Sequence, residues 1–300
     1  MAHTGLPFPC GGVAVLDGGL ATELEARGHD LRDALWSARL LADDPDAVLA
    51  AHRAYFRAGA DVATTATYQA SFDGFAARGV ERAEVARLLR RGVALAARAR
   101  DEVAGDGRRR FVAASVGPYG AALADGSEYR GRYGLTVAAL TAWHRPRLDM
   151  LVDAAPDLLA VETVPDADEA QALVAALAGS PVPAWLSYSV AGDRTRAGQP
   201  LAEAFAVLAA APEVVAVGVN CCAPDDVGPA VAAARASTGK PVVVYPNSGE
   251  QWDARARRWV GPAGFDTAQA AGWVAAGAAA VGGCCRVGPT AIAAVVRALR

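Results

Sequence analysis

Short apolar runs alternate with longer Ala-, Leu- and Arg-rich segments along the whole chain. The short runs are rich in Val and end at Gly, Pro, Asp or Asn, a pattern that predicts strands. The longer segments repeat apolar residues at helical spacing, as in residues 85–95, which predicts amphipathic helices. The expected strands are residues 13–16, 61–68, 111–116, 158–163, 184–190, 214–221, 241–246 and 278–283. The expected helices are residues 46–58, 81–103, 136–152, 201–210, 266–275 and 289–299, with two more beginning near residues 166 and 226.

These strand–helix units follow one another without a linker-like break. Alternating strands and helices favour a parallel sheet, and eight units in 300 residues are what a closed (β/α)8 barrel, or TIM barrel, requires. We therefore predict an α/β protein with a single barrel domain over residues 1–300. A doubly wound open sheet is the alternative. In a barrel the chemistry lies at the carboxyl ends of the strands, so functional residues are expected there.

Polar and cysteine residues follow the predicted strands, and their types restrict the reaction class. None of them is a histidine, and the chain has no G-x-S-x-G turn, which disfavours a His-based metallohydrolase and a Ser-His-Asp hydrolase. The single lysine, Lys240, precedes a strand, which disfavours a Schiff-base lyase or aldolase. The strand-end residues are Asp17, Thr67, Tyr68, Gln69, Ser115, Glu162, Thr163, Ser187, Tyr188, Ser189, Asn220, Cys221, Asn247, Cys284 and Cys285.

Three cysteines are the most informative of these residues. Cys221 ends one predicted strand, and Cys284 and Cys285 follow another directly after two glycines. Three thiolates leave a tetrahedral Zn²⁺ one ligand short, and an open position is typical of catalytic zinc. We predict that they bind Zn²⁺ and that a substrate thiol takes the vacant position. A zinc store or redox sensor is the competing interpretation, but it has no need of Asp17 and Glu162 at other strand ends.

Composition and charge narrow the class further. With a net charge of −3 and no long basic run, the chain carries no sign of a nucleic-acid-binding surface. No apolar run approaches the ~20 residues that span a bilayer, and the N-terminus lacks the features of a secretory signal. Four of the five cysteines form two adjacent pairs, a poor disulfide framework, so we expect reduced thiols in the cytoplasm. Cys222 is expected to point away from Cys221 because strand side chains alternate.

Several longer motifs resemble one known family. LDGGLATELEARG, SVGPYGAALADGSEYRG, DLLAVETVPDADE, GVNC, VVYPNSGE and GGCC are similar to segments of the homocysteine S-methyltransferases, and the resemblance covers essentially the whole chain. It implies a (β/α)8 barrel with zinc on Cys221, Cys284 and Cys285. It also implies a homocysteine pocket at Asp17 and Glu162. By the same resemblance, Asn247 is a candidate ligand of the zinc when substrate is absent.

The implied reaction moves a methyl group from a sulfonium donor to the thiol of L-homocysteine, giving methionine. S-methylmethionine and S-adenosylmethionine are the expected donors, and betaine is a further alternative. A cobalamin or folate route is disfavoured because one barrel leaves no room for those modules. The partners are then small molecules alone, and the oligomeric state stays open.

The residue types suit this chemistry. A free thiol with a pKa of about 8.5 is mostly protonated at neutral pH, and coordination to Zn²⁺ deprotonates it. Glu162 is the candidate partner for the ammonium group of homocysteine. The amides of Gly18 and Gly19 are candidates for its carboxylate, with Asp17 orienting their turn or sharing the ammonium. Asn220, beside Cys221, is a further substrate-binding candidate.

The methyl donor is a cation, so aromatic faces near the barrel mouth are expected to bind it. The polar, Gly-rich segment of residues 125–134 carries Asp125, Glu128 and Tyr129. We expect this segment to act as a lid over the substrates. The candidate donor-binding residues are Trp36, Tyr68, Tyr119, Tyr129 and Tyr188.

Overall fold

The eight predicted strands form one parallel sheet in the computed structural model, which describes residues 12–33, 35–253 and 258–300. The order within the sheet is β1-β12-β9-β8-β5-β4-β3-β2. A bridge between Leu16 and Val62, which follow β1 and begin β2, closes the ring. The (β/α)8 barrel is therefore confirmed. The strands are β1 (Ala14–Val15), β2 (Val62–Thr64), β3 (Phe111–Val116), β4 (Leu158–Val164), β5 (Ala184–Tyr188), β8 (Val214–Asn220), β9 (Val242–Tyr245) and β12 (Ala278–Val281).

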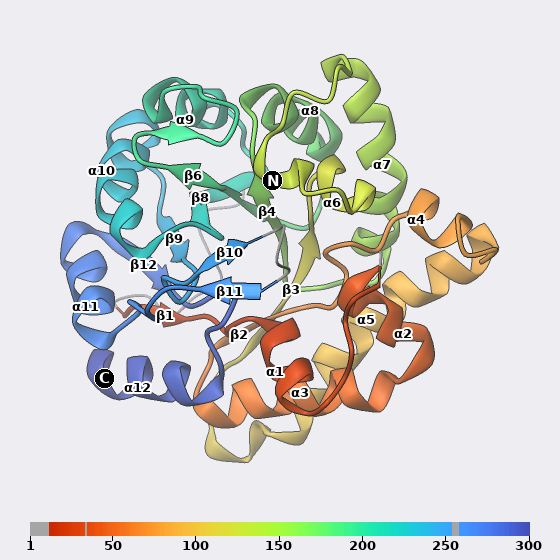
Figure 1. Ribbon diagram of the computed structural model, residues 1–300, viewed down its shortest axis with the longest axis horizontal. Helices are drawn as coiled ribbons and strands as arrows, with labels where there is room; N and C mark the ends of the chain where they lie inside the picture. The colour runs from red at the N-terminus through yellow and green to blue at the C-terminus, as the bar shows by residue number, and fades with distance from the viewer. Residues whose placement is uncertain (1–11, 34, 254–257) are drawn as a thin grey trace.

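Helices surround this ring of strands (Figure 1). Asp44, Asp166 and Asp266 begin three of them by accepting a backbone N–H of the first turn. The long helices are α3 (Pro45–Ala58), α5 (Arg82–Glu102), α7 (Val137–Asp153), α8 (Ala167–Leu177), α9 (Leu201–Ala209), α10 (Val227–Thr238), α11 (Thr267–Ala276) and α12 (Pro289–Leu299). The shorter ones are α1 (Leu20–Ala26), α2 (Leu40–Asp43), α4 (Phe72–Ala76), α6 (Tyr119–Leu123) and the 3-10 turns η1 (Trp36–Arg39), η2 (Ala104–Asp106), η3 (Ser127–Tyr129) and η4 (Pro224–Asp226).

The apolar side chains form two separate layers, one inside the barrel and one between strands and helices. The inner layer combines large rings, such as Phe111, Trp185 and Tyr245, with alanines on other strands. Trp185 donates its indole N–H to the Tyr245 hydroxyl at 2.9 Å, which satisfies both polar atoms inside the barrel. The barrel interior is thus filled by side chains, and the room for a ligand lies at its end.

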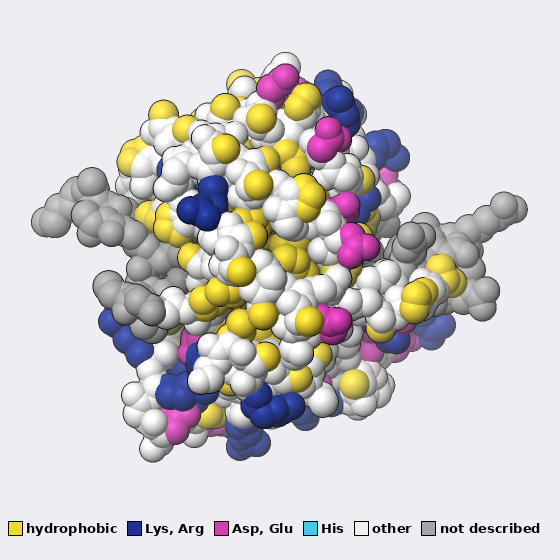
Figure 2. Space-filling model, turned by 90° about the vertical axis from the view of Figure 1, so that its left-hand side faces the viewer, with side chains coloured by type: hydrophobic (Ala, Val, Ile, Leu, Met, Phe, Trp, Pro, Cys, Tyr) yellow, Lys and Arg dark blue, Asp and Glu magenta, His cyan; other side chains and the backbone are white. Residues whose placement is uncertain are grey.

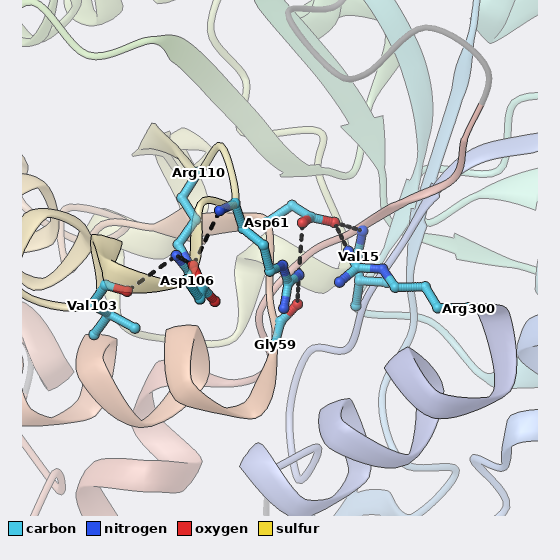
Figure 3. Close-up of polar contacts among 8 residues, drawn as sticks. Val15, Gly59, Asp61, Val103, Asp106, Arg110 and Arg300 are labelled. Carbon is cyan, nitrogen blue, oxygen red and sulfur yellow. Dashed lines mark hydrogen bonds and ion pairs between the residues drawn. The ribbon is translucent and has the colours of Figure 1, made fainter.

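A buried carboxylate joins the two ends of the chain where the ring closes (Figure 3). Asp61, just before β2, accepts the backbone N–H of Val15 at 2.9 Å. It also pairs with Arg108 at 2.9 Å and with the C-terminal Arg300 at 2.5 Å. Because Asp61 precedes its strand, this cluster lies at the amino-terminal end of the barrel, opposite the expected site.

Two hairpins are additions that the sequence did not predict. One is β6 (Val190–Ala191) with β7 (Arg194–Thr195), after β5, and the other is β10 (Gln251–Asp253) with β11 (Arg258–Val260), after β9. Figure 1 draws β10 and β11 over the middle of the ring. Both hairpins follow strand ends and therefore enlarge the carboxyl-terminal mouth.

The outer surface is mixed in character. In Figure 2, the face on the α10 and α11 side carries mainly hydrophobic and uncharged side chains, with Lys and Arg side chains scattered or toward one edge. Among the described residues, no helix is long and apolar enough to cross a membrane.

Candidate metal centre and substrate pocket

Cys221, Cys284 and Cys285 meet at the mouth of the barrel. The strands before them, β8 and β12, are separated in the sheet by β9 alone. The three sulfur atoms lie within 4.8 Å of one another, and those of Cys221 and Cys285 are 3.8 Å apart. A tetrahedral zinc with Zn–S bonds of about 2.3 Å needs sulfurs about 3.8 Å apart, so the thiols fit such an ion. Cys222 is fully buried in the outer apolar layer and lies outside the thiol cluster, as expected.

Backbone contacts hold the cysteine loops in place. The N–H of Cys284 donates to the Pro246 carbonyl at 2.7 Å, and that of Cys285 donates to Oδ1 of Asn247 at 3.1 Å. Cys221 has a φ of 52°, a left-handed conformation that is uncommon for a non-glycine residue. This unusual backbone re-aims its thiol at the end of β8. Asn247 lies beside the cluster, and its service as a metal ligand stays a prediction.

The three thiols share charge among themselves. Hydrogen bonds from Cys284 and Cys285 hold the pKa of Cys221 well below its ordinary value. The hydrogen bonds to Cys221 also raise the pKa values of the Cys284 and Cys285 thiols, because these two thiols act as the proton donors. The hydroxyl of Tyr129 lies 3.1 Å from the Cys221 sulfur and supports the same thiolate. A metal ion held by Cys221, Cys284 and Cys285 would take the place of the shared protons and stabilise all three thiolates.

Two buried carboxyl groups stand at the mouth, one directly after β1 and one near the end of β4. Asp17 is 2% exposed and accepts the N–H of Thr64 at 2.7 Å, and its Oδ1 lies 2.6 Å from the Thr64 hydroxyl. Glu162 is 8% exposed and accepts the hydroxyl of Ser115. Burial raises the pKa of Asp17 to about 8 and that of Glu162 to about 7. A cationic partner would return both groups to their charged forms.

One of the two DGG amides expected to bind the substrate carboxylate is already occupied, and the role expected for the Gly18 amide stays a prediction. The N–H of Gly19 donates to the Val287 carbonyl at 3.0 Å, so it is not available to a substrate carboxylate. A Cβ on Gly18 would lie 2.1 Å from the Val287 carbonyl oxygen, and one on Gly19 would lie 2.5 Å from that of Cys284. The glycines therefore let the turn touch the backbone that carries Cys284.

Asn220 also acts through another residue. Its side chain accepts the Thr163 N–H at 2.7 Å and donates to the Thr163 hydroxyl at 2.8 Å. Thr163 has a φ of 60°, so Asn220 holds a strained backbone directly after Glu162. In this arrangement both polar groups of Asn220 are occupied, and its contribution is to aim Glu162.

The five aromatic candidates separate into two groups. Trp36 and Tyr68 meet edge to face with ring centroids 6.3 Å apart, and Tyr129 contacts Cys221. Tyr188 is fully buried and donates to the Ala204 carbonyl of α9 at 2.8 Å, so it faces the helices instead of the mouth. The ring of Tyr119 packs against Tyr133 and Trp143, at centroid distances of 5.2 and 5.0 Å. Tyr188 therefore leaves the set of donor-binding candidates, and donor binding by Tyr119 stays a prediction.

A buried polar cluster anchors the segment that carries Tyr129. Glu169 accepts the N–H of Tyr119 at 2.6 Å and lies 2.9 Å from a ring nitrogen of His144. Arg147 donates to the carbonyl of Gly117 and contacts the other nitrogen of His144 at 3.1 Å. The backbone that leads into the expected lid segment is thus fixed by buried polar and charged side chains.

The structure shows the surroundings of two charged residues of the mouth, Glu128 and Arg196, that the sequence could not show. Oε2 of Glu128 is buried and has no hydrogen-bond partner among the described residues. Burial raises the pKa of Glu128 to about 7. Arg196, after β7, places its guanidinium 5.6 Å from the centre of the Tyr129 ring. The sequence carried no signal for Arg196, because it follows a hairpin and not a strand of the barrel.

A (β/α)8 barrel that gathers three thiols and two buried carboxyl groups at its mouth has the design of a metal-dependent enzyme for a small thiol or amino acid. Residues 14–299 match the family described as homocysteine S-methyltransferase, and the chain belongs to this family.

Relatives along the full length agree with this assignment. Homocysteine S-methyltransferase of Escherichia coli K12 is 46% identical over 292 residues, covering 94% of each chain. Homocysteine S-methyltransferase 4 of Zea mays is 47% identical over 317 residues, covering 100% of this chain and 93% of the relative. The solved metallated form of the homocysteine methyltransferase MmuM from Escherichia coli superposes with a TM-score of 0.86 at 44% identity, covering 94% of this chain and 95% of that one.

Proposed function

We propose that this protein transfers a methyl group from a sulfonium donor to the thiol of L-homocysteine, giving methionine, at a zinc ion held by Cys221, Cys284 and Cys285. The observation that carries the proposal is the position of two buried carboxyl groups beside a three-thiol centre. The thiols alone suit a metal store as well. Asp17 and Glu162 are costly to bury without a cationic partner, and the ammonium group of an amino acid is such a partner.

The protein residues prepare the acceptor for reaction. When bound, Zn²⁺ supplies the positive charge that deprotonates the substrate thiol. The three cysteine ligands keep the centre anionic overall, so the acceptor sulfur retains its electron density. Glu162 receives the ammonium group, and Asn220 and Ser115 hold Glu162 in place for it. Fixing the acceptor at both ends aligns its sulfur with the donor methyl group.

The donor is a cation, and the remaining residues of the mouth suit one. Trp36, Tyr68 and Tyr129 offer aromatic faces, and Glu128 offers a buried carboxylate oxygen that has no hydrogen-bond partner among the described residues. We assign these groups to the sulfonium of S-methylmethionine or S-adenosylmethionine. As the methyl group leaves, the donor becomes a neutral thioether and its attraction to this surface weakens, which favours product release.

The setting follows from the same chemistry. The four cysteines of the described residues are free thiols, and three of them gather at the mouth, which suits a reducing compartment, so we assign the protein to the cytoplasm. One barrel domain with small-molecule substrates is sufficient for the reaction. No nucleic-acid or membrane partner is required.

The test is methionine formation by the zinc-loaded protein. L-homocysteine with deuterium in its side chain distinguishes methionine made from the acceptor from methionine left by a demethylated donor. We expect labelled methionine with S-methylmethionine or S-adenosylmethionine, and little with betaine. Removal of zinc by a chelator should stop the reaction, and added zinc should restore it. No labelled methionine with any donor, from protein that holds zinc, would refute the proposal.

A further inference from the structure

The side chains assigned to the acceptor so far are all acidic. Three thiols, Asp17 and Glu162 surround the position of an amino acid that itself carries a carboxylate. The N–H of Gly19 is occupied by Val287. An anion placed in such a pocket needs a positive group within reach, since an unpaired buried carboxylate is strongly disfavoured.

Arg196 is the positive group that is tied to the metal centre. Its Nε lies 3.2 Å from the Ser189 hydroxyl, which donates to the Cys221 carbonyl at 3.2 Å. Its guanidinium also faces the ring of Tyr129, whose hydroxyl contacts the Cys221 sulfur. Two independent contacts therefore connect Arg196 to one ligand residue. The backbone is fixed as well, because the N–H of Arg196 donates to the Ser189 carbonyl at 3.1 Å.

Arg196 differs from other arginines of the mouth in having no acidic partner. Arg286 pairs with Glu250 at 3.1 Å, and Arg132 lies 3.6 Å from Asp166. Within the part of the chain that the structure describes, Arg196 forms no ion pair, and its hydrogen bond uses Nε alone. Its two terminal nitrogens form the planar fork that binds carboxylates with two parallel hydrogen bonds.

We infer that Arg196 binds the α-carboxylate of homocysteine and so determines that the acceptor is an amino acid. This inference rests on the proposed function. The acceptor is then held at three points: its sulfur at the cysteine centre, its ammonium at Glu162 and its carboxylate at Arg196. Simple thiols lack the last two contacts. The arrangement thus explains how a reactive thiolate centre avoids methylating the small thiols of the cell.

The experiment combines a substitution with a matched change in the substrate. Zinc-loaded wild type, Arg196→Met and Arg196→Lys are assayed with L-homocysteine and with 3-aminopropane-1-thiol, which lacks only the carboxylate. Arg194→Met, an exposed arginine on the same hairpin, is the control. Calorimetric titration of homocysteine into each zinc-loaded protein gives a Kd without turnover.

We expect Arg196→Met to raise the KM and Kd for homocysteine about 10- to 100-fold and to leave 3-aminopropane-1-thiol unaffected. Arg196→Lys should recover part of the loss, and Arg194→Met should match wild type. The inference would be overturned by an unchanged KM for homocysteine in Arg196→Met, or by an equal rise in KM for both thiols. Turnover by the wild type would still support the proposed function in either case. A rise confined to the KM of the sulfonium donor, which is also an amino acid, overturns the assignment to the acceptor. Failure of wild type to bind homocysteine overturns both.

Discussion

The sulfur atoms of Cys221 and Cys285 lie 3.8 Å apart, although 64 residues separate them along the chain. Strand order explains this approach, because β9 alone stands between β8 and β12 in the sheet. Parallel strands end at one edge, so residues that follow two nearby strands share the same space. The spacing of a metal site in a barrel is thus set by the topology of the sheet and not by a local sequence motif.

Replacement of a single ligand should release the metal. We expect Cys221→Ala, Cys284→Ala or Cys285→Ala to lower zinc from about one ion per chain to a small fraction, because two thiolates do not hold it tightly. Cys222→Ala is the matched control, since Cys222 is adjacent to a ligand but packs in the outer layer. Metal content by mass spectrometry after gel filtration measures the effect. Equal zinc in all four variants would contradict the assignment of ligands.

Glu162 should give homocysteine binding a pH dependence. Burial raises its pKa from an ordinary value of 4.5 to about 7, so the group is mostly protonated at pH 6 and ionised at pH 8. Only the ionised form attracts an ammonium group. We therefore expect the ratio of KM for homocysteine in Glu162→Gln to that in wild type to rise with pH, from near unity at pH 6 to at least about tenfold at pH 8. A ratio that is independent of pH would assign the ammonium to another group.

The DGG turn should matter for metal binding through its lack of side chains. A methyl group on Gly19 would push against the carbonyl of Cys284, so Gly19→Ala should weaken zinc binding by about 1–3 kcal/mol. Gly105→Ala is the control, because no atom lies within 4 Å of its added Cβ. Competition with a chromophoric chelator measures the affinity. Wild-type zinc affinity in Gly19→Ala would show that the turn tolerates a side chain.

Loss of the Asp61 carboxylate, at the amino-terminal end of the barrel, should reduce stability without reducing catalysis. Asp61→Ala leaves the buried N–H of Val15 without its acceptor and separates two arginines from their partner, at a cost of about 2–5 kcal/mol. Asp30→Ala, in a fully exposed pair with Arg32, should leave the urea midpoint unchanged. The kcat of folded Asp61→Ala should equal that of wild type, because the site lies at the other end of the barrel. A lowered kcat at full folding would contradict this separation.

The sequence was sufficient to place the strands along the chain, but it did not show in which direction their side chains point. All eight barrel strands and the meeting of Cys221 with Cys284 and Cys285 were predicted, because the strands are short apolar runs between helical segments and parallel strands end at a common edge. Tyr188 was misplaced for a physical reason. Strands of a barrel are apolar on both faces, so the alternation that would show which side chains point outward is absent.

Contacts between distant loops also could not be predicted from the sequence. The N–H of Gly19 is taken by Val287, a partner from the other end of the chain. Arg196 reaches the centre from a hairpin whose length and turn have no counterpart in the repeating strand–helix pattern. Such contacts depend on how loops cross above the barrel, and short-range patterns carry no information about this.

The position of β12 between β1 and β9 has a consequence for biosynthesis. During translation the ribosome delivers Cys284 and Cys285 after the other seven strands of the ring, and β12, which precedes them, fills the gap between β1 and β9. A chain whose synthesis has not passed β12 therefore lacks two of the three sulfur ligands. We expect zinc to bind only after the last strand of the ring has been made.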